Sequence, residues 1–394
     1  MTTTNHHAEE AQREERARQY DRIHNWLFVV DTVLAIAVLA ALNYRGERGV
    51  SYALLRVVER TVGKHVWVST AVYLAALVTG YVLAFLPYAW FKGFYLEHYF
   101  ELSTQRWYGW LWDEVKSWLL MLVIAVPLGS VWYWLMRTAG AWWWLWAAGV
   151  WVFLQVVLGM VFPVVILPLF YRSEPVENET LTHAVEELAS RCGVRVVGVY
   201  RLGLSAKTKK TNAALAGLGA TKRIFLGDTL LDQFAPAEVL SVLAHEFGHY
   251  RHRHVVKLMA GAGVLATGGM WSADRLMRVV AEWLQMSDVT SVATLPLLLL
   301  ALTLFGLITL PCTNALSRYF ERQADRFALE ATGDAGAFIG AMERLAAMNL
   351  ANPEPHPVIE WLLHSHPSIA RRIAGARAWQ SDAERHRSRA PAQR

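Results

Sequence analysis

Six long apolar runs restrict the fold of this chain more than any other feature of its sequence. About 20 consecutive apolar residues are enough for a helix to cross a membrane, where every backbone polar group must be paired within the protein. In chain order the runs are Trp26–Leu42, Val66–Leu86, Trp118–Met136, Ala141–Phe170, Val255–Trp271 and Val292–Pro311. Only 18% of the residues are charged, against ~25% in soluble domains. The sequence therefore predicts a mainly helical, multi-pass membrane protein with about six transmembrane helices.

The segment between the fourth and fifth runs has the composition of a soluble domain. Its apolar spacing predicts a helix over Glu177–Cys192 and a strand over Val194–Tyr200. Two further strands, Thr211–Leu215 and Arg223–Leu226, are joined by a glycine-rich stretch, which indicates a hairpin. Pro236 then opens another helix, where its missing N–H is tolerated. We expect that helix to continue into the fifth apolar run.

The helix that begins at Pro236 contains the sequence H-E-F-G-H at residues 245–249. Residues four apart lie on one face of a helix, so the rings of His245 and His249 can reach a single metal ion. This is the H-E-x-x-H signature of zinc peptidases, in which the glutamate, here Glu246, serves as general base and then as general acid. A match of five letters also arises by chance, so the assignment depends on the rest of the sequence.

A catalytic zinc site needs a third protein ligand, and the segment Asn314–Ala328 offers one. Glu321 and Asp325 are four apart on a predicted helix and therefore share a face. Glu321 could bind the metal while Asp325 orients a ligand histidine through its second ring nitrogen. In the alternative interpretation this is a surface helix on which the two carboxylates pair with neighbouring arginines such as Arg318 and Arg322. The H-E-x-x-H sequence favours the ligand interpretation.

Four other histidines lie near these motifs. His252 and His254 follow the zinc signature directly, and His252 could approach the same helix face, although we favour a basic cluster at the membrane interface. His364 and His366 belong to the sequence H-S-H-P. A histidine beside the metal can stabilise the oxyanion of a tetrahedral intermediate, but these two could equally mark the start of a helix. Distance along the sequence does not distinguish these interpretations.

Taken together, these motifs resemble a known family. The chain has H-E-F-G-H, then two apolar runs, then S-R-Y-F-E-R-Q-A-D-R-F-A and S-H-P, as in the integral-membrane zinc endopeptidases that include the type-1 CAAX prenyl proteases. The segments Thr211–Leu231 and Phe85–Glu97 also resemble that family, and the resemblance extends over about Val66 to Arg372. The chain departs from the eukaryotic pattern in having six apparent spans rather than seven, and it lacks a long insertion before the zinc helix.

The resemblance implies a role for each matching residue. It implies His245, His249 and Glu321 as ligands of one Zn²⁺ per chain, with Glu246 as general base and acid. Asp325 would orient a ligand, and His366 would stabilise the transition state. Asn212 and Ala213 would lie on an edge strand that pairs with an extended substrate. The implied fold is a ring of membrane helices around a chamber, capped by a cytosolic α+β zinc-peptidase domain of the gluzincin type with a small sheet.

These expectations define a domain plan. A polar N-terminal segment (1–25) precedes a four-span membrane region (26–171) and a soluble zinc-peptidase part (172–254). Two more spans follow (255–312), then the segment with the third ligand (313–380) and a basic tail (381–394).

Loop charges predict the orientation of this protein in the membrane. With six spans, the N-terminus, the zinc domain and the C-terminus share one side, which carries a dense group of cations that includes Lys207, Lys209 and Lys210. The opposite side has a short loop with five cations, which argues against this bias, and few others; the five are Arg45, Arg48, Arg56, Arg60 and Lys64. We therefore expect the zinc domain to face the cytoplasm. The net charge of +5 comes with no nucleic-acid-binding motif, so we expect no nucleic-acid partner.

The function predicted from the sequence is that of a zinc-dependent membrane endopeptidase resembling the CAAX prenyl proteases. Its partners would be the lipid bilayer and a peptide or protein substrate, either prenylated or embedded in the membrane. One alternative is a quality-control peptidase of the HtpX type, although four apolar segments before the zinc domain argue against the two-span plan of that branch. The other is a non-catalytic membrane scaffold, against which the intact Glu246 and complete ligand set argue.

Overall fold

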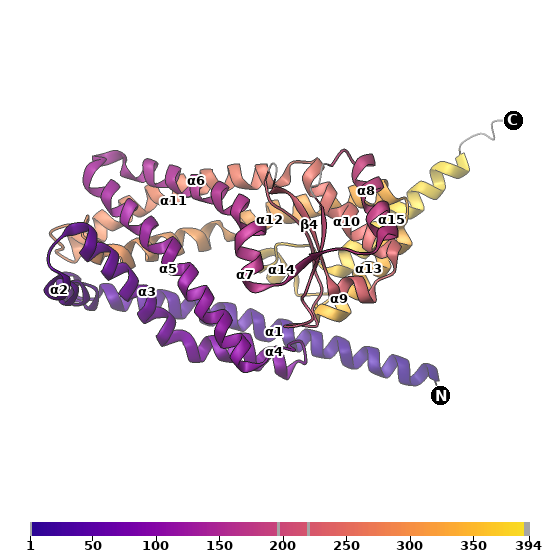
Figure 1. Ribbon diagram of the computed structural model, residues 1–394, viewed down its shortest axis with the longest axis horizontal. Coiled ribbons are helices and arrows are strands. Elements are labelled where there is room, and N and C mark those ends of the chain that lie inside the picture. Colours follow the sequence, from indigo (N-terminus) through magenta and orange to yellow (C-terminus); the bar gives the residue numbers. More distant parts are fainter. Residues whose placement is uncertain (1, 195–197, 219–220, 390–394) are drawn as a thin grey trace.

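The computed structural model describes residues 2–194, 198–218 and 221–389. Long helices run along the longest axis of the molecule, and a smaller part that contains a sheet lies at one end (Figure 1). The long helices are α1 (Thr2–Asn43), α3 (Val66–Trp90), α5 (Trp107–Thr138), α6 (Trp143–Val161), α11 (His254–Trp283) and α12 (Leu295–Thr332). The shorter helices are α2 (Val50–Val62), α4 (Leu96–Tyr99), α7 (Leu167–Phe170), α8 (Glu179–Arg191), α9 (Asp228–Gln233), α10 (Pro236–Arg251), α13 (Ala335–Asn349), α14 (Pro357–Leu363) and α15 (Ile369–Arg389).

Five helical stretches in the described part of the chain are long and apolar enough to cross a membrane. They are Ala11–Asn43, Val66–Tyr99, Trp107–Thr138, Gly140–Phe170 and Val292–Thr332. They contain the first four predicted spans and the sixth. The predicted fifth span, Val255–Trp271, lies in α11, which packs against α6 and α12 but is not one of these five stretches. A sixth crossing therefore stays a prediction, as does the enclosed chamber.

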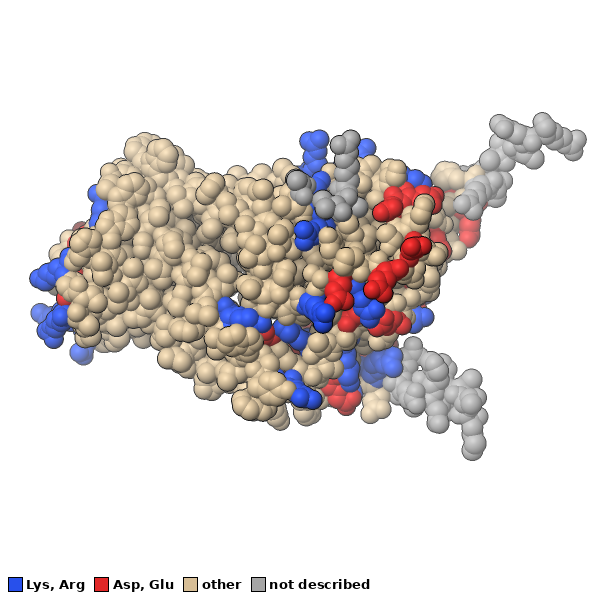
Figure 2. Space-filling view, viewed as in Figure 1, with Lys and Arg blue, Asp and Glu red and all other residues tan. Residues whose placement is uncertain are grey.

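The distribution of charge on the surface agrees with a membrane location. On the face shown in Figure 2, charged side chains gather over the end that contains the sheet and at the opposite tip near α2. Between them lies a broad band with almost no charged side chains (Figure 2). Such a band is what a hydrocarbon layer about 30 Å thick requires of the surface that faces it.

The sheet has four strands in the order β1-β2-β4-β3. Its strands are β1 (Ser173–Pro175), β2 (Val199–Leu202), β3 (Ala213–Ala216) and β4 (Arg223–Gly227). β3 and β4 pair antiparallel, with Ala213 opposite Leu226, which confirms the predicted hairpin to within two residues at each end. The strand predicted over Val194–Tyr200 lies partly outside the described residues, and β2 begins at Val199. Because β3 is the last strand in the order, one of its sides remains open.

The helix α10 passes through the core of this part of the molecule. Leu243 and Phe247 are completely buried, and burial of each such side chain contributes about 1.5–3 kcal/mol. α10 packs chiefly against α12, with further contacts to α8 and α13. Gly248 makes this packing close, since a Cβ on it would lie only 3.0 Å from the Cα of Ala324. The motif on α10 is therefore held directly against the segment of α12 that contains Glu321 and Asp325.

The structure corrects one prediction about α10. We expected this helix to continue into the fifth apolar run, but α10 ends at Arg251 and α11 begins at His254. Arg253, between them, has a φ of 56°, in the left-handed region. The sequences on both sides of Arg253 favour helix, so sequence patterns predict one continuous helix. The break depends on the backbone conformation of Arg253 alone.

The loop before β3 is held in place by a buried carboxylate. Asp228 accepts hydrogen bonds from the backbone N–H groups of Leu204, Ser205 and Thr229 and from the Ser205 hydroxyl. Burial alone would raise the pKa of Asp228, but these donors outweigh it and hold the pKa below its usual range. The ionised carboxylate thus ties this loop to the start of α9, and the loop leads into the open strand β3.

Candidate metal centre

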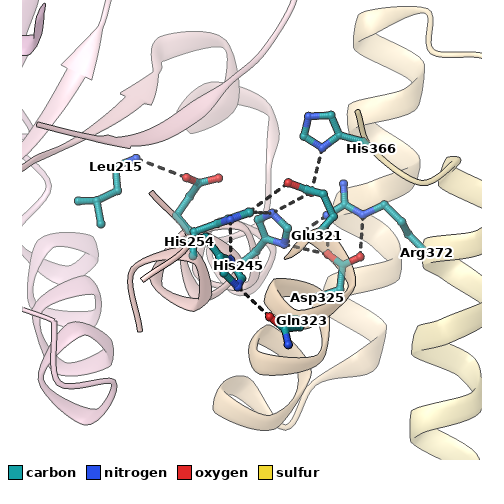
Figure 3. Close-up of polar contacts among 10 residues, drawn as sticks. Leu215, His245, His254, Glu321, Gln323, Asp325, His366 and Arg372 are labelled. Atoms are coloured by element: carbon teal, nitrogen blue, oxygen red, sulfur yellow. Dashed lines mark hydrogen bonds and ion pairs between the residues drawn. The ribbon is translucent and has the colours of Figure 1, made fainter. Parts of the chain in front are cut away.

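Three side chains from two helices converge in the structure. His245 and His249 come from α10, and Glu321 comes from α12. Figure 3 shows His245 and Glu321 facing one another. Each offers one ligand atom, and these atoms all lie within 4.8 Å of one another. In the described residues this is the one group of three or more histidine, cysteine or acidic side chains with that geometry. The structure brings together the three residues predicted as metal ligands.

The separations between these atoms suit a small metal ion. Nε2 of His249 lies 3.1 Å from Nε2 of His245 and 3.2 Å from Oε1 of Glu321. Nε2 of His245 lies 3.4 Å from Oε2 of Glu321. Ligands about 2.05 Å from a tetrahedral zinc ion are about 3.3 Å apart. Two imidazole nitrogens and a carboxylate oxygen are also the donor types that zinc accepts at catalytic sites.

The surface-helix alternative for α12 does not describe this structure. Glu321 is 4% exposed and Asp325 is 8% exposed. Arg318 donates to the backbone carbonyls of Glu360 and His364 instead of pairing with Glu321. Oε2 of Glu321 is buried, and although Nδ1 of His366 lies 2.8 Å from it, no contact to it in the described residues has hydrogen-bond geometry. A buried carboxylate oxygen without a well-directed partner is costly, so a cation at this point would satisfy it.

Asp325 connects His245 to a buried arginine. Its Oδ1 lies 2.8 Å from Nδ1 of His245, on the opposite side of the ring from Glu321. Arg372, from α15, donates two hydrogen bonds to the same carboxylate, from Nε to Oδ2 at 2.9 Å and from Nη2 to Oδ1 at 2.5 Å (Figure 3). Burial would lower the pKa of His245, but the contacts with Asp325 and Glu321 outweigh it and raise the pKa to about 9. A cation bound between the rings would displace that proton.

Glu246 lies beside this group and faces the sheet. Its Oε2 accepts a hydrogen bond of 3.4 Å from the backbone N–H of Leu215 in β3 (Figure 3). The carbonyl of Asn212 bonds to the N–H of Gly227 in β4, and hydrogen bonding alternates along an antiparallel pair. The backbone groups of Ala213 and Leu215 therefore point away from β4, toward the open side where Glu246 lies.

His366 reaches the same group from the loop before α15. Its Nδ1 lies 2.8 Å from Oε2 of Glu321, and its side chain is 61% exposed. His364 is turned away and lies 3.7 Å from Asp21 of α1. The structure therefore separates the two histidines of H-S-H-P and brings only His366 to the candidate ligands.

His254 differs from its predicted environment. We favoured an interfacial basic cluster, but the side chain is completely buried and its Nδ1 lies 3.1 Å from Nδ1 of His249. Its Nε2 lies 2.9 Å from Oε1 of Gln323 (Figure 3). Burial lowers the pKa of His254 to about 4, so the ring is neutral near pH 7. The break before α11 explains the error, because it turns this histidine back toward α10.

The sequence analysis missed Gln323 and Arg372. Gln323 lies between Glu321 and Asp325 in the sequence. Its spacing of four residues from Tyr319 predicts a contact between those two side chains on one helix face, but it does not indicate a contact with His254. Arg372 lies 47 residues after Asp325, and nothing in the sequence near it indicates that contact.

Two family models match adjacent parts of the chain. The model described as peptidase family M48 matches residues 175–380. The model described as CAAX prenyl protease N-terminal, five membrane helices, matches residues 5–172. Together they cover the membrane helices and the candidate metal centre.

Individual proteins resemble the chain over most of its length. The uncharacterized metalloprotease YhfN of Bacillus subtilis is 31% identical, over 91% of this chain and 84% of that protein. CAAX prenyl protease 1 of Saccharomyces cerevisiae is 27% identical, over 76% of this chain and 70% of that protein. The crystal structure of S. mikatae Ste24p superposes with a TM-score of 0.82 at 21% identity, covering 93% of this chain and 89% of that chain. Because its sequence identity is only 21%, the match to the Ste24p structure supports the fold alone.

Proposed function

This chain belongs to peptidase family M48, and from that premise we propose that it is a zinc-dependent membrane endopeptidase that cleaves extended peptides. One observation carries the proposal. Glu246 lies between a set of three zinc-type ligands and the open edge of a strand that can receive a peptide. A scaffold without activity would have no need of a carboxylate in that place.

We assign the metal ligands to His245, His249 and Glu321, with one Zn²⁺ per chain. The ion would supply Lewis-acid chemistry, polarising the scissile carbonyl and making water acidic enough to attack it near pH 7. Asp325 holds His245 with the proton on Nδ1, so that Nε2 is free to bind, and Arg372 holds Asp325.

Glu246 would move the proton. In the cleavage step it accepts a proton from the attacking water and donates it to the leaving amine. The Leu215 N–H that contacts it keeps the carboxylate turned toward the open edge of β3. His366, exposed and adjacent to Glu321, would donate a hydrogen bond to the oxygen that gains negative charge.

The substrate would bind as an added strand along β3. The N–H and carbonyl of Ala213 and the carbonyl of Leu215 would offer the hydrogen bonds, since the N–H of Leu215 already contacts Glu246, and Asn212 would flank them. An extended peptide in that place would have its carbonyls near the proposed metal site and Glu246, because Glu246 contacts the same strand edge. Strand addition recognises backbone rather than side chains, so it accounts for an endopeptidase without fixing the sequence it cuts.

The substrate class rests on the relatives. Curated relatives named CAAX prenyl protease 1 match 76% of this chain, and a model for the membrane part of such proteases matches residues 5–172. We therefore favour a prenylated C-terminal peptide over an HtpX-type quality-control substrate. Cleavage by the purified protein of matched peptides with and without the prenyl-cysteine distinguishes them. A preference for the prenylated peptide supports the first, and equal cleavage of both supports the second.

The placement in the membrane completes the proposal. We propose six spans, with Val255–Trp271 of α11 as the fifth, and a zinc domain that faces the cytoplasm. The cations of the loop before β3 support this orientation, because Lys207 and Lys210 form ion pairs with Asp113 and Glu97, which lie near the ends of two helical stretches of membrane length. A substrate anchored in the inner leaflet would then lie on the same side as the site.

The test of the activity is Glu246→Gln. The amide keeps the shape of the carboxylate but cannot accept a proton, so we expect normal zinc content and peptidase activity lower by about 10²–10⁴-fold. Zinc is measured by elemental analysis, and activity is measured with a fluorogenic peptide in detergent. Glu187→Gln, on the exposed face of α8, is the matched control and should behave as wild type. A fully zinc-loaded Glu246→Gln protein that cleaves at the wild-type rate would rule out this mechanism.

A further inference from the structure

The two candidate histidine ligands have different supports. Nδ1 of His245 meets Asp325, a carboxylate paired with Arg372. Among the described residues, Nδ1 of His249 contacts no carboxylate. It lies 3.1 Å from Nδ1 of His254, and the two rings are nearly perpendicular at 76°. A metal-binding histidine usually donates its second N–H to an acceptor that fixes the ring. For His249, that acceptor has to be another histidine.

A chain of hydrogen bonds runs from His249 through His254 and Gln323 to Tyr319. The role of His249 as a metal ligand determines which atom donates at each step. Nε2 of His249 faces Glu321, so as a ligand atom it carries no proton, and the proton of that ring lies on Nδ1. Nδ1 of His254 must then accept, which leaves the His254 proton on Nε2. That N–H donates to Oε1 of Gln323, 2.9 Å away. The amide of Gln323 donates in turn to the hydroxyl oxygen of Tyr319, also at 2.9 Å. Every donor from His249 to Tyr319 has one acceptor.

The backbone and the core hold His254 in this place. On an uninterrupted helix, a residue five positions after His249 would lie about 7.5 Å further along the axis and about 140° around it. The left-handed conformation of Arg253 breaks the helix and brings the ring back. The ring is then stacked on Phe320, with centroids 4.4 Å apart and planes within 14°. Strained backbone of this kind persists where the surrounding structure requires it, often at functional sites.

We propose that His254 is a positioning residue for the metal ligand His249. It selects the tautomer of His249 that leaves Nε2 free and holds that ring toward Glu321, while Gln323 sets the tautomer of His254. The inference rests on the proposed metal site. The two histidine ligands would then be held in different ways: His245 by the charged carboxylate of Asp325, and His249 by the neutral ring of His254.

The test measures Zn²⁺ affinity of the full-length protein in detergent, by competition with a chromogenic chelator. His254→Leu removes the acceptor, and we expect its affinity to fall by about 10–100-fold. His254→Asn places an amide oxygen near the position of Nδ1 and should recover part of that loss. His252→Leu is the matched control. Its ring stacks on that of His254, with centroids 5.4 Å apart, and makes no side-chain hydrogen bond in the described structure, so the change removes packing against His254 but leaves the hydrogen bonds in place, and the variant should bind as wild type. The absorption spectrum of the Co²⁺-substituted protein should change for His254→Leu and not for His252→Leu.

The outcomes separate this inference from the proposed function. A folded His254→Leu protein with wild-type Zn²⁺ affinity and Co²⁺ spectrum overturns it. If that variant fails to fold, Gln323→Leu decides: weaker affinity supports the inference, and unchanged affinity overturns it. Failure of the metal site itself has a different signature, namely a wild-type protein that binds Zn²⁺ no more tightly than His245→Ala.

Discussion

At the scale of single residues, each of the two candidate histidine ligands contacts a neighbouring side chain outside the proposed ligand set. The clearest case is Asp325, whose carboxylate is shared between His245 and Arg372. Both members of this ion pair are buried, with side-chain exposures of 12% for Asp325 and 10% for Arg372. Removing one member of a buried pair leaves the other charge unpaired and costs about 3–5 kcal/mol. Substitution of Asp325 would therefore disturb both folding and metal binding, so Glu321 is the better residue for testing the ligand set.

Glu321→Ala should lose most of the bound zinc. The change removes one of three proposed protein ligands, so we expect Zn²⁺ affinity to fall by at least ~100-fold, more than for loss of a supporting residue. Chelator competition and elemental analysis of the purified protein measure it. Glu330→Ala, an exposed glutamate on the same helix that pairs with Arg326, is the control and should keep full zinc. Full zinc in Glu321→Ala would show that another residue provides the third ligand.

At the scale of elements, the open edge of β3 is the part of the sheet to which we propose that the substrate binds. β4 uses the backbone groups of alternate residues in β3, and the groups of Ala213 and Leu215 remain on the other side. Two neighbouring alanines, Ala213 and Ala214, therefore have opposite roles although their side chains are identical. That difference can be tested with proline, which removes one N–H and fits best at an edge where that N–H is not part of the ladder.

Ala213→Pro should weaken substrate binding and keep the fold. It removes an N–H that faces the substrate side, and a hydrogen bond is worth about 0.5–1.5 kcal/mol net, so KM should rise by about 2–10-fold. Zinc content and the melting temperature should stay near wild type. The matched Ala214→Pro removes an N–H that faces β4 and should lower the melting temperature instead. An unchanged KM in a stable Ala213→Pro protein would contradict binding along this edge.

At the scale of the whole molecule, charge is concentrated at its two ends. The α/β end carries both signs, and the opposite tip near α2 carries mainly lysine and arginine on the face shown in Figure 2. Since both ends contain cations, the orientation depends on which cluster is retained in the cytoplasm during insertion. The denser group around the loop before β3 favours a cytoplasmic metal site.

Cysteine labelling tests that orientation directly. In a Cys312→Ser background, we place a cysteine at Arg137, which is exposed near the end of α5, or at Glu187, which is exposed on α8. Intact cells treated with a membrane-impermeant maleimide should label Arg137→Cys. Glu187→Cys should label only after the membrane is made permeable. Labelling of both positions in intact cells, or of Glu187→Cys alone, would contradict the proposed topology.

The sequence by itself determined the features that depend on local repetition. Runs of about 20 apolar residues predicted the five stretches of membrane length. The spacing of four placed His245 with His249 and Glu321 with Asp325, and the glycine-rich stretch between two predicted strands indicated the β3–β4 pair. These patterns succeed because helix and strand geometry relate residues a few positions apart.

Only the tertiary structure decided the features that join distant residues or depend on one torsion angle. Arg372 meets Asp325 because α15 packs beside α12, and no local pattern records a contact over 47 residues. His254 lies beside His249 because Arg253 adopts a positive φ, which propensity would not assign to arginine. The choice of His366 over His364 likewise depends on how the loop before α15 passes over Glu321. Local periodicity determines which faces exist, and close packing of the whole chain determines which faces meet.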